Sequence, residues 1–176
     1  MENIGFKIDV SGIFNGEKKE IPFEFELLPE EIASGDIAFP KPVCVSGRVY
    51  EMAGGNSGAD SYVVLEMRLC GEYATHCARC AEEVTKTFDI NAQFGVAEEV
   101  SEDETDYVEA QGGILDAGET ARTVFYLELP SKVLCRETCR GLCPMCGRNL
   151  NTGICSCQPD SGKRKPLADL KKLLDN

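Results

Sequence analysis

Hydrophobic and polar residues alternate along much of the first hundred positions of the chain. Alternating runs of this kind cover residues 4–10, 21–27, 43–49, 63–69 and 88–94. A period of two places apolar side chains on one face of a strand and polar side chains on the other. The segments between the early runs contain Gly, Asn and Asp, the residues that turns favour. The pattern predicts an antiparallel β domain over residues 1–97 with one buried face and one wet face.

A pair of cysteines separates the fourth and fifth runs. The intervening stretch, THCARCAEEV, contains Cys77 and Cys80 within a short segment that suits a turn. We expect the two runs to be neighbouring antiparallel strands joined at this cysteine turn.

The next stretch is strongly acidic. Residues 98–109 hold seven acidic side chains in twelve positions, which repel one another and bury little apolar surface. We therefore expect residues 98–112 to be a linker or a mobile loop.

Helical signals follow within residues 113–176. Asp116 stands three residues before Glu119, as in a helix-capping box, and Pro130 ends the apolar run that follows. Near the end of the chain, Pro166 precedes four leucines on one helical stripe, which predicts a short C-terminal helix. The overall class expected is α+β, with a mainly antiparallel β domain followed by a helix, a cysteine-rich segment and that C-terminal helix. The four leucines are Leu167, Leu170, Leu173 and Leu174.

Cysteine content changes the picture. The chain has ten cysteines in 176 residues, and neither a signal-peptide pattern nor the roughly 18 consecutive apolar residues of a membrane span is visible. These features indicate a cytoplasmic protein without membrane contact. In a reducing cytosol, metal binding or redox chemistry is a better explanation for many cysteines than structural disulfides.

Eight of the ten cysteines form four close pairs. A C-x-x-C pair directs two sulfur atoms into one site, and a structural zinc ion takes four such ligands. By count, the pairs supply two complete four-cysteine zinc sites. The pairs are Cys77 with Cys80, Cys135 with Cys139, Cys143 with Cys146, and Cys155 with Cys157.

Two partitions of these pairs are open at the level of sequence. The preferred one joins Cys143, Cys146, Cys155 and Cys157 in a small zinc ribbon, and leaves the pairs at 77/80 and 135/139 to connect the sheet with the C-terminal segment. The other joins the four cysteines between 135 and 146, and leaves the pairs at 77/80 and 155/157 together.

Zinc is favoured over an iron–sulfur cluster because the cysteine spacings match neither common ferredoxin pattern. A mononuclear iron in a site of the same type is the competing metal. A site of four thiolates has no open coordination position and is structural rather than catalytic.

The remaining candidates for chemistry are few. A C-x-x-C pair is also the dithiol of oxidoreductases, but that motif belongs next to a βαβ pattern, which this sequence lacks. Cys44 and Cys70 fall inside strand patterns and are expected to be ordinary strand residues, and His76, the only histidine, is expected not to be a ligand. No phosphate-binding loop and no nucleophile–base set is visible, so we expect a protein that is not an enzyme and has no small-molecule substrate.

Charge is distributed unevenly. Residues 132–176 carry nine basic and four acidic side chains, a net charge of +5, whereas the whole chain carries −12. Such asymmetry suggests a basic tail that faces a polyanion, attached to an acidic body. Candidate contact residues are Arg148, Lys163, Arg164 and Lys165.

Taken in order, these motifs resemble a known family. The CARC element after a β run, the acidic stretch, the segment LELPSKVLCRETCRGLCPMCGRNLNTGICSC and the helix PLADLKKLL are similar to the YceD-type large ribosomal RNA subunit accumulation proteins. The resemblance implies a non-enzymatic cytoplasmic factor needed for large-subunit ribosomal RNA to accumulate, with that RNA or a ribosomal protein as partner. Two alternatives stay open: a dithiol redox protein, and an adaptor that binds a basic ribosomal protein through its acidic face.

Overall fold

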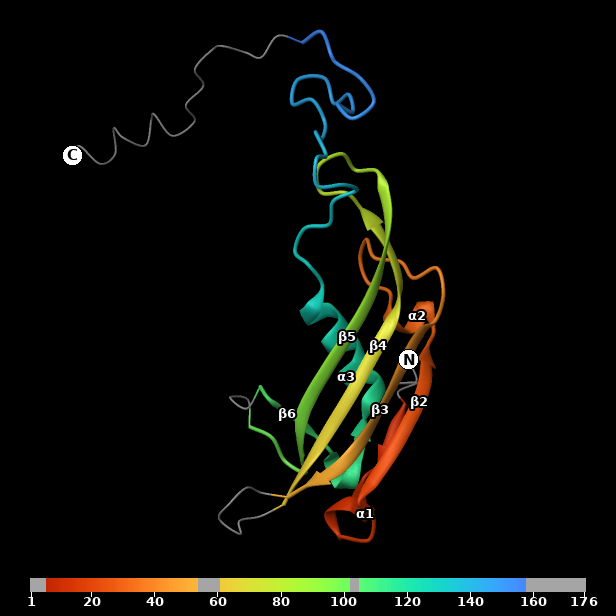
Figure 1. Cartoon of the computed structure of the whole chain (residues 1–176), viewed down its shortest axis with the longest axis vertical. Helices are drawn as coiled ribbons and strands as arrows, with labels where there is room; N and C mark the ends of the chain where they lie inside the picture. The colour runs from red at the N-terminus through yellow and green to blue at the C-terminus, as the bar shows by residue number, and fades with distance from the viewer. Residues whose placement is uncertain (1–5, 54–60, 102–104, 158–176) are drawn as a thin grey trace, which may run out of the picture.

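The computed structural model describes residues 6–53, 61–101 and 105–157. Its main element is a five-stranded sheet with one helix, α3, on one face (Figure 1). The expected α+β class with a cysteine-rich segment is confirmed. The strands lie in the order β2 (Glu20–Leu27), β3 (Val43–Met52), β4 (Tyr62–His76), β5 (Glu83–Ala97) and β6 (Tyr107–Glu109).

Strands β2 to β5 form where the alternating pattern predicts them, and each pairs antiparallel with the next. Their apolar positions point to one face. Val45, Leu65 and Leu69 have no exposed surface, whereas Ser46 and Arg48 on the opposite face are exposed. One face of the sheet thus packs into the core, and the other face is in water.

The first alternating run has a different partner. The described part of residues 4–10 contains β1 (Lys7–Asp9), which pairs antiparallel with β7 (Ile114–Asp116) in a separate two-stranded sheet. The chain then enters the single helical turn α1 (Ser11–Phe14), and the backbone N–H of Val10 donates to the carbonyl of Gly113 over 2.8 Å. This run therefore ties the start of the described chain to the segment just before α3.

Part of the acidic stretch expected as a linker or loop is a strand. Residues 107–109 form β6, which pairs parallel with the end of β5, so that Val108 lies opposite Val96. A 3₁₀ turn (Gln111–Gly113) follows and leads into β7. Three residues are too few for alternation to reveal a strand, which explains why the acidic composition dominated the prediction.

Helix α3 (Ala117–Glu128) begins where the capping pattern predicts, because the backbone N–H of Glu119 donates to Asp116 Oδ1 over 2.9 Å. Its residue Phe125 is only 1% exposed and lies at the centre of the core. The ring of Phe125 contacts those of Phe39, Tyr73 and Phe88, with centroids 5.1, 5.8 and 4.9 Å apart. Burial of these aromatic rings fixes the helix on the sheet.

A second contact joins α3 to the turn after β2. The Tyr126 hydroxyl donates to the carbonyl of Ile32, the last residue of α2 (Pro29–Ile32), over 2.6 Å.

The described part of the chain contains no buried charged side chain. None of its helices is both long and apolar enough to cross a bilayer.

The long strands β4 and β5 carry the cysteine turn beyond the core. Strand β3 begins at Val43. The last part of β4 (residues 71–76) and the first part of β5 (residues 83–88) therefore pair mainly with each other, from Gly71 opposite Phe88 to His76 opposite Glu83. After α3 the chain returns to this end of the hairpin (Figure 1). The cysteine-rich segment therefore meets the hairpin tip. The expected C-terminal helix, with Pro166 and its leucines, lies outside the described residues.

Candidate metal centres

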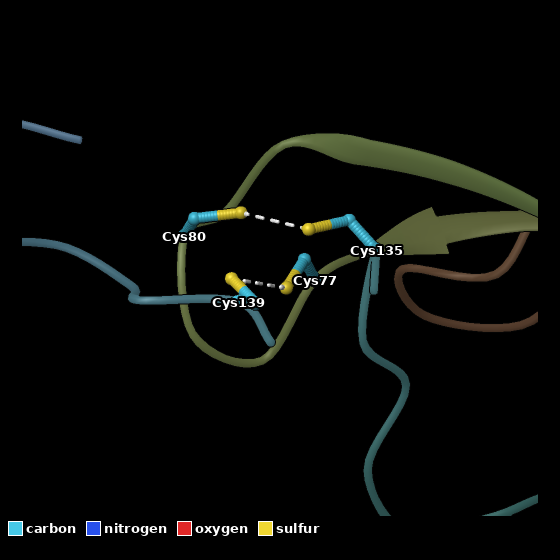
Figure 2. A group of neighbouring side chains, drawn as sticks. All are labelled: Cys77, Cys80, Cys135 and Cys139. Atoms are coloured by element: carbon cyan, nitrogen blue, oxygen red, sulfur yellow. Dashed lines mark hydrogen bonds between the residues drawn. The ribbon is translucent and has the colours of Figure 1, made fainter. Parts of the chain in front are cut away.

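The first group of four cysteines lies at the tip of the β4–β5 hairpin. The Sγ atoms of Cys77, Cys80, Cys135 and Cys139 all lie within 4.8 Å of one another (Figure 2). Sγ of Cys77 is 3.8 Å from that of Cys139, and Sγ of Cys80 is 3.6 Å from that of Cys135. Three of the four residues are at most 4% exposed, and Cys135 is half-buried, so most of the group is shielded from solvent.

Local backbone geometry aims the first pair of thiols inward. The N–H of Cys77 donates to the carbonyl of Glu82, and the N–H of Ala81 donates back to the carbonyl of Cys77, over 2.8 and 2.9 Å. Ala81 adopts a left-handed conformation with φ of 56°, which closes this tight turn. The N–H of Ala78 donates to the carbonyl of Val133 over 2.9 Å, and this bond brings Cys135 to the hairpin.

The second group is built from a short local segment. The Sγ atoms of Cys143, Cys146, Cys155 and Cys157 also lie within 4.8 Å of one another. The N–H of Gly147 donates to the carbonyl of Cys143 over 2.9 Å, and Gly147 has the left-handed φ of +70° that this turn needs. Cys146 is exposed, so this group is more open than the first.

The structure thus groups the thiols according to the preferred partition from the sequence. The competing arrangement, with residues 135, 139, 143 and 146 in one group, is not the one found. The reason is the position of the hairpin tip, which lies next to Val133 and receives the 135/139 pair first. Cys143 and Cys146 lie in the turn that follows this pair, and their sulfurs group with those of Cys155 and Cys157.

Arg79, between the two hairpin cysteines, connects the two groups. Its Nη1 atom donates to the carbonyl of Cys139 over 2.9 Å, and its own carbonyl accepts from the N–H of Leu142 over 3.0 Å. Gly141 lies so close to Arg79 that a Cβ there would be 2.9 Å from the Arg79 carbonyl oxygen. The second group is therefore docked directly on the turn that holds the first.

Two asparagines and one glutamate complete this connection. Asn149 Nδ2 donates to Glu82 Oε1 over 2.8 Å, and the thiol of Cys80 lies 3.6 Å from Glu82 Oε2. Asn151 Nδ2 donates to Cys139 Sγ over 3.2 Å. Sequence reasoning missed these residues, and Arg79 entered it only as part of the CARC motif. The one available signal was their position within a few residues of the cysteine pairs.

The thiols of the first group differ strongly in acidity. Burial opposes ionisation of Cys77, but the backbone N–H groups of Arg79, Cys135 and Cys80 together lower its pKa to about 6. A backbone hydrogen bond at Glu82 favours the Cys80 thiolate, yet burial and the neighbouring sulfurs raise the pKa of Cys80 to about 12. Without a cation, the thiolate of Cys77 therefore accepts a hydrogen bond from a neighbouring thiol that stays protonated, that of Cys80.

The second group repeats this arrangement. The backbone N–H groups of Cys146 and Met145 lower the pKa of Cys143 to about 6. A hydrogen bond with Cys146, together with burial and the charge of the other sulfurs, raises the pKa of Cys157 to about 12. Four thiols that cannot all ionise by themselves are a ligand set that a divalent cation completes, because the cation compensates the negative charge.

The spacing of the sulfurs suits such a cation. Zinc–sulfur bonds of about 2.3 Å in a tetrahedron place neighbouring sulfurs roughly 3.8 Å apart. The distances of 3.6 Å between Cys80 Sγ and Cys135 Sγ and of 3.4 Å between Cys155 Sγ and Cys143 Sγ approach this value. Among the described residues, His76 belongs to neither group of four.

The predicted contact residues have separate outcomes. Arg148 is exposed on the second group, where its carbonyl accepts from the N–H of Cys143 over 2.8 Å. Lys163, Arg164 and Lys165 lie outside the described residues. The structure thus places one basic side chain of this set, that of Arg148, beside the second candidate metal site.

Comparison with known sequences agrees with the cysteine arrangement. Residues 65–174 match the family described as large ribosomal RNA subunit accumulation protein YceD, a range that includes both cysteine groups. The chain belongs to the YceD family. The resemblance that the motifs suggested is thereby confirmed.

One curated YceD relative is the chloroplastic large ribosomal RNA subunit accumulation protein YCED homolog 1 of Zea mays. It is 39% identical over 46 residues, which are 26% of this chain and 16% of the maize protein. The matched region thus spans about a sixth of the length of that relative. No solved structure matches the chain.

Proposed function

We propose that this YceD-family protein is a non-enzymatic cytoplasmic factor that supports accumulation of large-subunit ribosomal RNA during ribosome assembly. The observation that carries the proposal is the family match over residues 65–174, since the family is named for that role. Both cysteine groups, and most of the sheet that positions them, fall within the matched range.

In this proposal each cysteine group holds one structural zinc ion. Cys77, Cys80, Cys135 and Cys139 are the ligands of one ion, and the four cysteines between 143 and 157 are those of the other. Zinc with four thiolates stabilises a local fold and leaves no coordination position for a substrate. Four thiolate ligands for each ion support a structural role and a protein that is not an enzyme.

The partner-binding surface proposed is the segment around the second group. Residues 138–157 contain Arg140 and Arg148 and no acidic side chain. The apolar side chains of Met145 and Ile154, 60% and 86% exposed, lie on the same segment. Exposed cations beside exposed apolar groups suit contact with ribosomal RNA or with a ribosomal protein bound to it.

The proposal is tested by deleting the gene and measuring the ratio of large-subunit to small-subunit ribosomal RNA. Deletion lowers the ratio, and the intact chain restores it. A chain with Arg140→Glu and Arg148→Glu fails to restore it, whereas the matched double reversal Lys18→Glu/Lys19→Glu, at two exposed positions before β2, restores it fully. An unchanged ratio in the deletion strain would contradict the proposed function.

Co-sedimentation with large-subunit precursors then separates the surfaces. The double arginine reversal reduces binding to these precursors if the second group makes the contact. A chain in which the acidic residues of 98–109 are replaced by their amides keeps its binding. The opposite result, loss of binding only in the neutralised chain, would favour an adaptor that binds a basic ribosomal protein.

A further inference from the structure

Two cysteines outside the metal-type groups lie opposite each other in the main sheet. Cys44 of β3 and Cys70 of β4 are direct partners in the antiparallel register. Their neighbours Val45 and Leu69 point into the core, so both cysteines point to the face away from α3. Cys44 is exposed and Cys70 is half-buried. The sequence predicted only ordinary strand residues at both positions, because register is not visible in a single run.

The backbone spacing of such a pair suits a disulfide. Residues directly opposite each other in an antiparallel pair have Cα atoms about 4.5 to 5.5 Å apart. Disulfides span Cα separations of roughly 4.4 to 6.8 Å. A bond between Cys44 and Cys70 therefore requires no change in the pairing of β3 with β4.

A carboxylate lies at each end of the row that contains the two thiols. The row across the sheet runs from Glu26 through Cys44 and Cys70 to Asp89. Partial burial raises the pKa of Cys44, and the neighbouring Cys70 and Glu26 raise it further. Asp89 is held by Arg68 through two hydrogen bonds of 2.6 and 2.7 Å.

The same row is not a metal site. Among the described residues, the groups able to hold a cation contain only the other eight cysteines. Cys44 and Cys70 thus remain the two thiols that a bound metal would not protect.

We propose that Cys44 and Cys70 form a site of reversible oxidation by a low-molecular-weight disulfide such as oxidised glutathione. The thiolate of the exposed Cys44 attacks one sulfur of the oxidant, forming a mixed disulfide and releasing one thiolate. The Cys70 thiolate then attacks Cys44 Sγ, forming the cross-strand bond and releasing the second thiolate. The two cysteines lose two electrons and two protons, and the oxidant is reduced to two thiols.

This inference does not depend on the proposed function. Oxidation joins β3 to β4 on the face of the sheet opposite α3, whereas the two groups of four cysteines lie at the tip of the β4–β5 hairpin. Only the thiolate form of Cys44 attacks. The rate therefore rises about tenfold for each unit by which the pH increases, as long as the pH is below the pKa of Cys44. The site therefore responds to sustained oxidation and not as a fast catalytic thiol.

The test uses the full chain loaded with zinc and incubated with oxidised glutathione at several pH values, followed by alkylation, intact mass measurement and peptide mapping. The expected product has lost two hydrogens, keeps all its zinc and contains a peptide pair linked through Cys44 and Cys70. In Cys70→Ser, Cys44 instead retains one glutathione. Cys44→Ser/Cys70→Ser shows neither product.

Two results would overturn the inference. One is a parent chain that accumulates glutathione on Cys44 without closing the bond, which would place Cys70 out of reach. The other is a linked peptide pair drawn from the metal-type groups, accompanied by zinc release. Zinc content is measured in the same samples, so a failure of the zinc proposal is distinguished from a failure of this one.

Discussion

Asn151 donates a side-chain hydrogen bond to the sulfur of Cys139 over 3.2 Å, so a residue of the second cysteine segment supports a thiol of the first group. This bond is the largest cause of the lowered pKa of Cys139. Asn151 is itself held in place, since its Oδ1 atom accepts from the N–H of Arg140 over 2.8 Å. Asn151 therefore adds a side-chain link between the two cysteine groups to the links that Arg79 and Glu82 make.

Asn151→Ala is expected to weaken zinc binding at the first group by roughly 10- to 100-fold, as for other residues that orient a ligand. Without the amide N–H, the pKa of Cys139 rises and protons compete for its sulfur up to a higher pH. On acidification the variant therefore releases zinc at a higher pH than the parent does. Chelator competition and a zinc-release titration measure both effects.

The matched control for this variant is Asn91→Ala on the exposed face of the sheet. It is expected to leave zinc affinity and the release pH unchanged. Equal behaviour of the two variants would show that Asn151 has no role in metal binding.

Removal of the metal is expected to release the cysteine-rich segment and preserve the sheet. The main hydrophobic core contains no cysteine, whereas the small cluster at the hairpin tip is built around Cys77, Cys80 and Cys139. Zinc contributes about 10 to 16 kcal/mol of apparent binding free energy in small zinc domains. The segment from residue 134 to 157 thus depends on it.

Limited trypsin digestion checks this prediction. After chelation, cleavage accelerates at Arg136, Arg140 and Arg148, and the far-ultraviolet circular dichroism of the strands is retained. Arg48 and Arg68, within paired strands, serve as internal controls and stay protected. Loss of protection at these strand sites would show that the sheet also unfolds.

Gly141→Ala is expected to lower the thermal midpoint of the metal-loaded protein more than Gly147→Ala does. Both glycines are left-handed, with φ of +74° and +70°, so an alanine costs roughly 1 to 2 kcal/mol at either position. Only at Gly141 would the new Cβ approach Arg79, whereas nothing lies within 4 Å of a Cβ at Gly147. Equal midpoints would mean that docking on Arg79 adds no stability.

Phe125→Ala is expected to destabilise the protein by about 3 to 5 kcal/mol, because it leaves a cavity among the aromatic rings of the core. Leu127→Ala on the same helix is the control, since Leu127 is 75% exposed and its change is expected to stay within about 0.5 kcal/mol. Denaturant unfolding measures both. A small effect at Phe125 would indicate that α3 is not essential to the core.

The sequence was informative where one periodic pattern decides the structure. Alternation predicted the strands that contain Phe23, Val45, Leu65 and Ile90, and capping at Asp116 predicted the start of α3. Such elements depend on residues close together in the chain, so a single sequence suffices for them.

Other features depend on contacts between distant segments. The partner of β1 lies more than a hundred residues away, and β6 is too short for a pattern. The same limit applies to the site, because nothing local in the sequence indicates that Asn151 meets Cys139 or that Cys44 lies opposite Cys70. The choice between the two cysteine partitions depends on which cysteine pair reaches the hairpin tip after α3, and in the structure it is the 135/139 pair.

The contact between Cys80 and Cys135 spans 55 positions in sequence. A metal shared by these residues closes a ring that contains β5, β6, β7 and α3. Closing a long ring reduces the number of conformations open to the unfolded chain, so the cation can stabilise elements that it does not touch. The metal at the hairpin tip would thereby help to hold Phe125 in the core, and mild chelation would lower the unfolding free energy of α3 before any strand is lost.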